Sequence, residues 1–292
     1  MPGKRELPGR KRRIPAALIL FALFLLWIPL ELYLSNNAPR TEAVTVRLPR
    51  LPAAFDGARI LHLSDMHEKV FGKDNETLLR MAEKASPDII AVTGDFIQSP
   101  EGLAYAENLL PRLTAVAPVY YVTGNHEWAN DNNRTHLIQR LKAIVEGCGG
   151  VWLDSSFTIW ERGGEPVVLA GLCDPNGPRA EPDAGELRRQ IDAAAGGGLF
   201  TILLSHRHDR ISVYAAAGFD VVLAGHAHGG VVRLPFTDGL IGPDRDWFPK
   251  GTSGVLAAGD TRVVVSRGVG DTYFPRFLNR PQVLVVTLRR GG

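Results

Sequence analysis

The sequence predicts an α/β sandwich joined to an N-terminal transmembrane helix. From residue 58 to residue 146, short apolar runs alternate with amphipathic stretches, an order that indicates helices packed on a mostly parallel β-sheet. Residues 157–288 contain many more extended runs than helical ones, and neither an internal repeat nor an interior linker divides the body. The first 34 residues differ from the rest, because a basic tail precedes a long apolar stretch.

Composition and charge exclude several classes of protein. The chain has 292 residues, of which 45% are hydrophobic and 22% charged, so it is neither disordered nor of low complexity. Residues 1–13 hold six basic residues and one acidic residue, which leaves 27 basic and 30 acidic residues elsewhere, a net charge of −3. A body with that balance is not expected to bind nucleic acid. Two cysteines, Cys148 and Cys173, are too few for a disulfide scaffold or a thiolate zinc site.

Residues 14–34 are expected to be a transmembrane anchor. Ile14–Leu30 is a run of 17 residues without charge, which is close to the shortest helix that spans a bilayer. Trp27 and Tyr33 suit the membrane–water interface. Because the basic residues 1–13 precede the span, the positive-inside rule predicts a cytoplasmic N-terminus and an extracytoplasmic body in a single-pass cell-membrane protein.

A cleaved signal peptide is the alternative to an anchor. Its apolar core would be about 7–15 residues long and closely followed by an A-x-A-like site. The weak candidate Thr41-x-Ala43 lies well beyond the apolar run, which favours an uncleaved anchor. Residues 35–42 then form a polar linker, and residues 43–292 form one domain.

The elements of the body follow from apolar periodicity and from helix-ending residues. Ser86-Pro87 ends the first helix, Pro111 is expected to shorten the second, and Gly147 ends the third. Expected helices cover residues 76–85, 103–113, 134–146, 184–194 and 209–217. Expected strands cover residues 58–63, 89–93, 119–123, 157–160, 167–172, 200–204, 221–224, 231–234, 262–266 and 283–288.

Five short polar clusters each come at the end of an expected strand. Ligands of open α/β sheets bind at the carboxyl ends of the strands, so we expect these clusters to converge. In order along the chain they are Asp65-Met66-His67, Gly94-Asp95, Gly124-Asn125-His126-Glu127, His206 and Gly225-His226-Ala227-His228.

The donor types in these clusters indicate a pair of metal ions. In an extended chain, residues i and i+2 point the same way, so Asp65 with His67 and His226 with His228 can each direct two ligands at one site. Imidazole, carboxylate and amide groups without thiolate suit Mn, Fe or Zn rather than Cu(I) or an iron–sulfur cluster. Seven donors exceed the ligands of one zinc ion, and they match two ions that share a bridging carboxylate.

The ordered pattern D-x-H, G-D, G-N-H-E, H and G-H-x-H resembles the calcineurin-like metallophosphoesterase signature. Segments 265–270 and 279–282 resemble the membrane-anchored bacterial branch related to YkuE. The resemblance implies mixed β-sheets flanked by helices and two divalent metal ions. By position, it implies that Asp65, His67 and His228 bind one ion and that Asn125, His206 and His226 bind the other. It further implies that Asp95 bridges both ions, while His126 protonates the leaving group or stabilises the transition state.

The implied function is hydrolysis of phosphate ester or pyrophosphate bonds by a metal-bridging hydroxide. Two cations would clamp the phosphate oxygens and neutralise the developing charge. The expected substrate is a phosphorylated small molecule or a lipid-linked one, and the anchor is consistent with a lipid-linked or cell-envelope substrate. Some members of the branch resemble UDP-2,3-diacylglucosamine pyrophosphatases, whose cytosolic substrate an extracytoplasmic site would disfavour. Two alternatives remain: a non-catalytic interaction protein that keeps the fold, and a metal-dependent hydrolase of non-phosphate esters. A non-catalytic member is expected to lack ligands or the acid histidine, and every such position is filled here.

Residues outside the motif leave several readings open. Arg233, Arg267 and Arg276 are either bidentate phosphate contacts or surface arginines. Trp247 and Phe248 stand in a long Pro/Gly-rich stretch, where they either line a lipid or sugar groove or plug the core under the loop.

Overall fold

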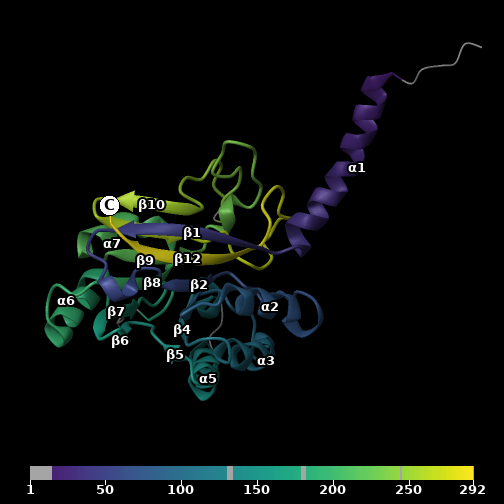
Figure 1. The fold of residues 1–292 in the computed structure, drawn as a ribbon. Helices are drawn as coiled ribbons and strands as arrows, with labels where there is room; N and C mark the ends of the chain where they lie inside the picture. The colour runs from purple at the N-terminus through teal and green to yellow at the C-terminus, as the bar shows by residue number, and fades with distance from the viewer. Residues whose placement is uncertain (1–14, 130–133, 179–181, 244, 292) are drawn as a thin grey trace, which may run out of the picture.

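Two six-stranded mixed sheets face each other in the computed structural model, which describes residues 15–129, 134–178, 182–243 and 245–291 (Figure 1). The first sheet has the order β1 (Arg40–Leu48), β12 (Gln282–Arg290), β2 (Arg59–Leu63), β3 (Ile89–Thr93), β4 (Val119–Val122) and β5 (Val151–Trp152). The second has the order β10 (Gly254–Ala258), β11 (Thr261–Val265), β9 (Val221–Gly225), β8 (Thr201–Arg207), β7 (Glu165–Gly171) and β6 (Ser156–Arg162). The central strands β2, β3 and β4 are parallel, as are β7, β8 and β9, so their carboxyl ends share one edge of each sheet.

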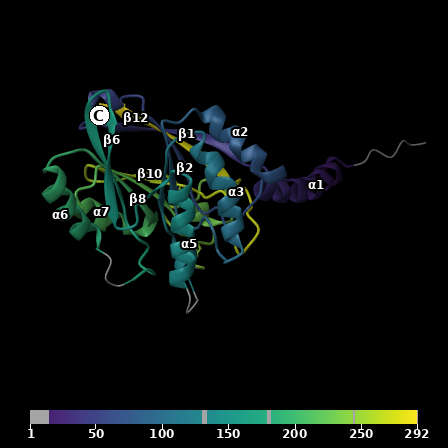
Figure 2. The same cartoon turned by 90° about the horizontal axis from the view of Figure 1, so that it is seen from below.

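Helices cover the outer face of each sheet and complete a four-layer sandwich (Figure 2). Helices α2 (Glu76–Ala85), α3 (Gly102–Thr114) and α5 (Arg134–Gly147) pack on the first sheet, and α6 (Ala184–Ala195) and α7 (Ile211–Ala217) pack on the second. Side chains alternate along the buried strands: Ile90 and Val92 of β3 face the helices, whereas Ile89 and Ala91 face the other sheet. The predicted fold class, mixed β-sheets flanked by helices, is confirmed.

Three expectations about the elements were wrong. Pro111 does not shorten its helix, because it lies in the last turn and the carbonyl that it leaves unbonded belongs to the exposed Glu107. Residues 231–234 form no strand; the chain leaves the sheet there, and Val232 makes only an isolated bridge with Phe277. The expected linker 35–42 instead contains the end of one helix and the start of β1.

Helix α1 (Ala16–Asn37) extends away from the body and exposes its apolar side chains (Figure 1). Among the described residues, it is the one helix long and apolar enough to cross a membrane. Its last turn is attached to the body, where Ser35 is buried and the Asn36 side chain donates a hydrogen bond to the carbonyl of Arg276 over 3.0 Å. The helix is therefore joined to the body by specific contacts as well as by the chain.

Candidate metal centre

The five polar clusters converge where β2, β3, β4, β8 and β9 end. Asp65 and Asp95 each follow a strand by two residues, Asn125 begins the short helix α4 (Asn125–Trp128), and His206 lies within β8. All seven expected metal ligands lie here, and six of them are buried: Asp65, His67, Asp95, His206, His226 and His228. Asn125 and His126 are partly exposed at the edge of the group.

Tight turns, and not extended backbone, aim the donors at one another. Asp65, His67, Asp95, His226 and His228 all have positive φ, between 45° and 66°. The expectation that extended i, i+2 pairs direct these side chains was therefore wrong, although the pairs do meet. A positive φ is uncommon in residues other than glycine. Among those residues it is most frequent in Asn, Asp and His, which are the residue types that supply the donors.

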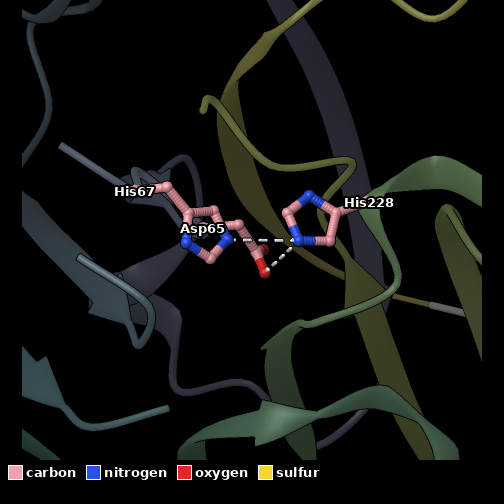
Figure 3. A group of neighbouring side chains, drawn as sticks. All are labelled: Asp65, His67 and His228. Atoms are coloured by element: carbon pink, nitrogen blue, oxygen red, sulfur yellow. Dashed lines mark hydrogen bonds and ion pairs between the residues drawn. The ribbon is translucent and has the colours of Figure 1, made fainter. Parts of the chain in front are cut away.

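One group of donors consists of Asp65, His67 and His228 (Figure 3). Their ligating atoms lie within 4.8 Å of one another; Nε2 of His228 is 3.3 Å from Nε2 of His67 and 3.4 Å from Oδ1 of Asp65. Burial raises the pKa of Asp65 to about 6 and lowers the pKa of His67 to about 4. Burial also lowers the pKa of His228, so both imidazoles are neutral at pH 7 and can offer lone pairs to a cation.

A second group consists of Asp95, His206 and His226, whose ligating atoms also lie within 4.8 Å of one another. Nε2 of His206 is 3.0 Å from Oδ1 of Asn125 and 3.2 Å from Oδ2 of Asp95. Burial alone would lower the pKa of His206, but the Asp95 carboxylate raises it to about 10. Nδ1 of His206 is 2.8 Å from the Thr93 carbonyl and donates to it, so Nε2 faces two oxygens that only accept.

This donor set fits a two-cation centre. Nε2 of His206 and the two oxygens that face it can lie this close only when a positive charge lies among them, and a divalent ion can replace the proton that His206 otherwise carries. Asp95 is placed between the groups, since its Oδ2 is also 3.8 Å from Nε2 of His67. The carboxylate, amide and imidazole groups could hold Mn, Fe or Zn.

Glu127 fixes the two loops that carry Asp95 and Asn125. Its buried carboxylate accepts hydrogen bonds from the backbone N–H groups of Asp95 and Gly124, both at 2.9 Å. It also accepts from the N–H of Phe96 at 2.7 Å and from the hydroxyl of Tyr121 at 2.8 Å. Glu127 therefore supports the backbone on either side of the site.

Arg276 supports His228 and does not contact the cavity. Its fully buried guanidinium lies 3.2 Å from Nδ1 of His228 and donates to the carbonyls of Arg267 and Gly270. Asn279 donates to the carbonyl of His228 over 2.7 Å. Arg267 pairs with Glu42 and Arg233 donates to backbone carbonyls, so none of the three arginines considered from the sequence lines the cavity.

A cavity of about 450 Å³ opens over the donors. His126 lines it with a quarter of its side chain exposed, and its Nε2 is 3.9 Å from Oδ2 of Asp95. The walls include Arg245, Tyr273 and Phe274, which sequence reasoning missed. These residues stand in loops without a strand-end position or a spacing that could have distinguished them.

Comparisons with known proteins agree with this geometry. A family model described as calcineurin-like phosphoesterase matches residues 58–230. The metallophosphoesterase YkuE of Bacillus subtilis is 29% identical over 275 residues, with 88% of each chain covered. The phosphodiesterase YaeI of Escherichia coli is 26% identical, with 79% of this chain and 82% of its own covered.

Two further matches extend the range of relatives. The UDP-2,3-diacylglucosamine pyrophosphatase LpxG of Chlamydia muridarum is 23% identical, with 92% of this chain and 94% of its own covered. Among solved structures, the NAD nucleotidase of Haemophilus influenzae aligns with a TM-score of 0.51 at 15% identity, a likeness of fold that covers 72% of this chain and 45% of that one. Because the family model matches more than half of the chain and includes every strand end that carries a donor, the chain belongs to the calcineurin-like phosphoesterase family.

Proposed function

We propose that this chain is a membrane-anchored phosphoesterase that uses two divalent metal ions to hydrolyse a phosphate ester or pyrophosphate bond. The observation that carries the proposal is the convergence of seven oxygen and nitrogen donors beneath a cavity that five of them line together with His126. Retention of every donor favours an enzyme over a non-catalytic interaction protein with the same fold.

The donors divide into two ligand sets that share one residue. Asp65, His67 and His228 would hold one ion, and Asn125, His206 and His226 would hold the other. Asp95, which contacts both groups, would bind both ions. When bound, the ions would neutralise the phosphate charge and supply the attacking nucleophile. The backbone contacts of Glu127 and Asn279, and the contact of Arg276 with the His228 imidazole, keep the donors in place before substrate arrives.

His126 is positioned to protonate the leaving group. It lies at the edge of the donors, lines the cavity and is more exposed than the imidazoles among the donors, so a bound ester oxygen can reach it. General acid catalysis of this kind contributes about 10²–10⁴-fold to a rate. Its contribution grows as the leaving group becomes a poorer one, because a basic alkoxide needs the proton more.

We expect the purified chain to hydrolyse bis-p-nitrophenyl phosphate with manganese, and a chelator to abolish that activity until metal is restored. The His126→Ala variant should lose about 10²–10⁴-fold in kcat and keep its metal content. The loss should be greater for an alkyl phosphodiester than for the p-nitrophenyl ester.

A matched control is His136→Ala, which removes an exposed imidazole on α5 and should change neither kcat nor the metal content. Absence of activity in the wild-type chain with two metal ions demonstrably bound would count against the enzyme, and loss of metal from His126→Ala would make this residue a ligand.

The anchor supports an extracytoplasmic site and a substrate attached to lipid. Helix α1 is apolar and exposed, and six basic residues precede it. The relative LpxG is named for a lipid-linked pyrophosphate, which supports that substrate class here. With the N-terminus in the cytoplasm, a protease added outside intact spheroplasts should digest the body. Protection of the body until the membrane is permeabilised would reverse the proposed orientation.

A further inference from the structure

Exposed aromatic side chains occur in two places among the described residues: on α1 and on two loops beside the cavity. On α1 they are Phe21, Phe24, Trp27 and Tyr33. On the loops they are Phe236, Trp247, Phe248, Tyr273 and Phe274, which we call the aromatic rim. Phe236 is fully exposed, and Trp247 and Tyr273 are exposed to 67% and 76%. Large apolar groups gathered on one part of a surface indicate a binding surface.

The rim is structurally continuous with α1. Trp27 of α1 packs edge-on against Phe277, with ring centroids 5.7 Å apart. The carbonyl of Phe277 accepts a hydrogen bond from the N–H of Arg233 at 2.9 Å, immediately before the loop that carries Phe236. In Figure 1 this loop rises from the body on the side toward which α1 extends. A bilayer that contains α1 would therefore lie next to the rim.

The chemistry of the rim suits a bilayer interface. Phe, Trp and Tyr are the side chains that favour the boundary between headgroups and acyl chains. Residues 233–250 contain three basic and three acidic residues, so attraction to an anionic surface does not explain the exposed aromatics. Tyr273 and Phe274 also line the cavity, where the Arg245 guanidinium lies 5.9 Å from the Tyr273 ring centroid. A membrane in contact with the rim would meet the mouth of the cavity.

We propose that the aromatic rim rests in the interfacial layer of the lipid bilayer and holds the cavity mouth against the headgroups, so that a phosphoester embedded in the membrane enters directly. The inference rests on the proposed anchor and phosphoesterase function and deepens both. It assigns the rim to lipid, and it makes the phosphate of a membrane-resident lipid the group that reaches His126 and the donors.

The position of the rim can be measured without any enzyme activity. In the full chain with Cys148→Ser and Cys173→Ser, a single cysteine is introduced as Phe236→Cys or, for control, Val213→Cys, and is labelled with an environment-sensitive fluorophore. Val213 is exposed on α7, far from α1 (Figure 2). In phosphatidylcholine vesicles, spin-labelled lipid should quench the label at residue 236 strongly and that at residue 213 weakly, at low and at high salt. Equal quenching at the two positions would overturn the proposal. It is also the result expected if the rim binds a protein partner and not lipid.

A second measurement connects the rim to turnover. Bis-p-nitrophenyl phosphate and phosphatidyl-p-nitrophenol both release p-nitrophenol. The first is soluble, whereas the second is held in the membrane of the vesicles. The double variant Phe236→Ser, Trp247→Ser changes two exposed side chains that do not line the cavity. We expect a severalfold loss on the vesicle substrate and an unchanged rate on the soluble one. Equal effects on both would contradict the rim's role, whereas inactivity of the wild-type chain on both would count against the proposed function and leave the quenching result standing.

Discussion

Replacing Asp95 by asparagine is expected to reduce kcat/KM by more than about 100-fold, since even the hydrogen-bond partners of a metal ligand contribute 10–100-fold. Oδ2 of Asp95 faces an imidazole of each donor group, at 3.2 Å from Nε2 of His206 and 3.8 Å from Nε2 of His67. Asparagine keeps the shape and can still accept the 2.8 Å hydrogen bond from the N–H of His126, but it removes the charge shared by the two sites. Metal analysis should show fewer than two ions per chain.

Stability measurements separate this effect from misfolding. The buried Asp95 carboxylate raises the pKa of Asp65 and of Glu127, which means that it repels both when no cation is present. Asp95 also pairs with His206, whose pKa it raises to about 10, and the neighbouring histidines hold the pKa of Asp95 itself well below its ordinary value. In chelator, Asp95→Asn should therefore unfold at a lower temperature than the wild type, because the buried His206 loses its charged partner. Added manganese should stabilise the wild type far more than the variant. An ion that binds only the folded state raises the free energy of unfolding, and the increase is larger when the ion binds more tightly.

Asp220→Asn is the matched control for Asp95→Asn. Asp220 is also buried, but it pairs with Arg50 and accepts from Thr201, away from the cavity. Its replacement should lower stability and leave metal content and turnover per folded chain unchanged. Two ions bound to Asp95→Asn with near wild-type kcat/KM would rule out a shared carboxylate.

The meeting of the donors was predictable because it depends on topology. Once the strands before Asp65, Asp95 and Asn125 are parallel neighbours, their carboxyl ends share an edge, and the residues that follow must be close. Apolar runs were enough to locate those strands; β3 and α2 have the bounds expected from the sequence. The same reasoning located the end of β9 to within one residue, whereas β8 continues to Arg207, beyond the expected end at residue 204, so that His206 lies within it.

The local geometry was not predictable, because tertiary contacts determine it. The positive φ of Asp95 follows a close approach between two loops, in which a Cβ on Gly94 would lie 2.4 Å from the backbone nitrogen of Gly124. Nothing in the strand before Asp95 indicates that contact. Strand β1 was missed for a related reason: it pairs with β12, some 240 residues away, and its first three residues, Arg40, Thr41 and Glu42, continue the polar run that begins at Ser35. Arg276 is buried only because backbone carbonyls from two separate loops, those of His228 and of Arg267 and Gly270, surround it.

Replacing Glu127 by alanine should produce the largest loss of stability, because one carboxylate serves several buried donors. The N–H groups of Asp95, Phe96 and Gly124 and the hydroxyl of Tyr121 would all lose their partner. Each buried donor left without an acceptor costs about 1–3 kcal/mol, and some relaxation will recover part of that. We expect the free energy of unfolding to fall by about 4 kcal/mol or more, a large fraction of a typical total of 5–15 kcal/mol.

The Glu127→Gln variant tests whether the unpaired hydrogen-bond donors cause the loss of stability. Oε1 of Glu127 serves Phe96 and Tyr121, whereas Oε2 serves Asp95 and Gly124. In Glu127→Gln, one oxygen can still accept, but the NH₂ group must face donors on the other side, so the loss should be intermediate. Glu146→Ala on α5 removes only an exposed pair with Lys142 and should cost less than about 1 kcal/mol. Denaturant unfolding of the full chain in detergent with chelator measures all three without a contribution from metal binding. A Glu127→Ala variant no less stable than Glu127→Gln would show that the unpaired donors are not what the carboxylate prevents.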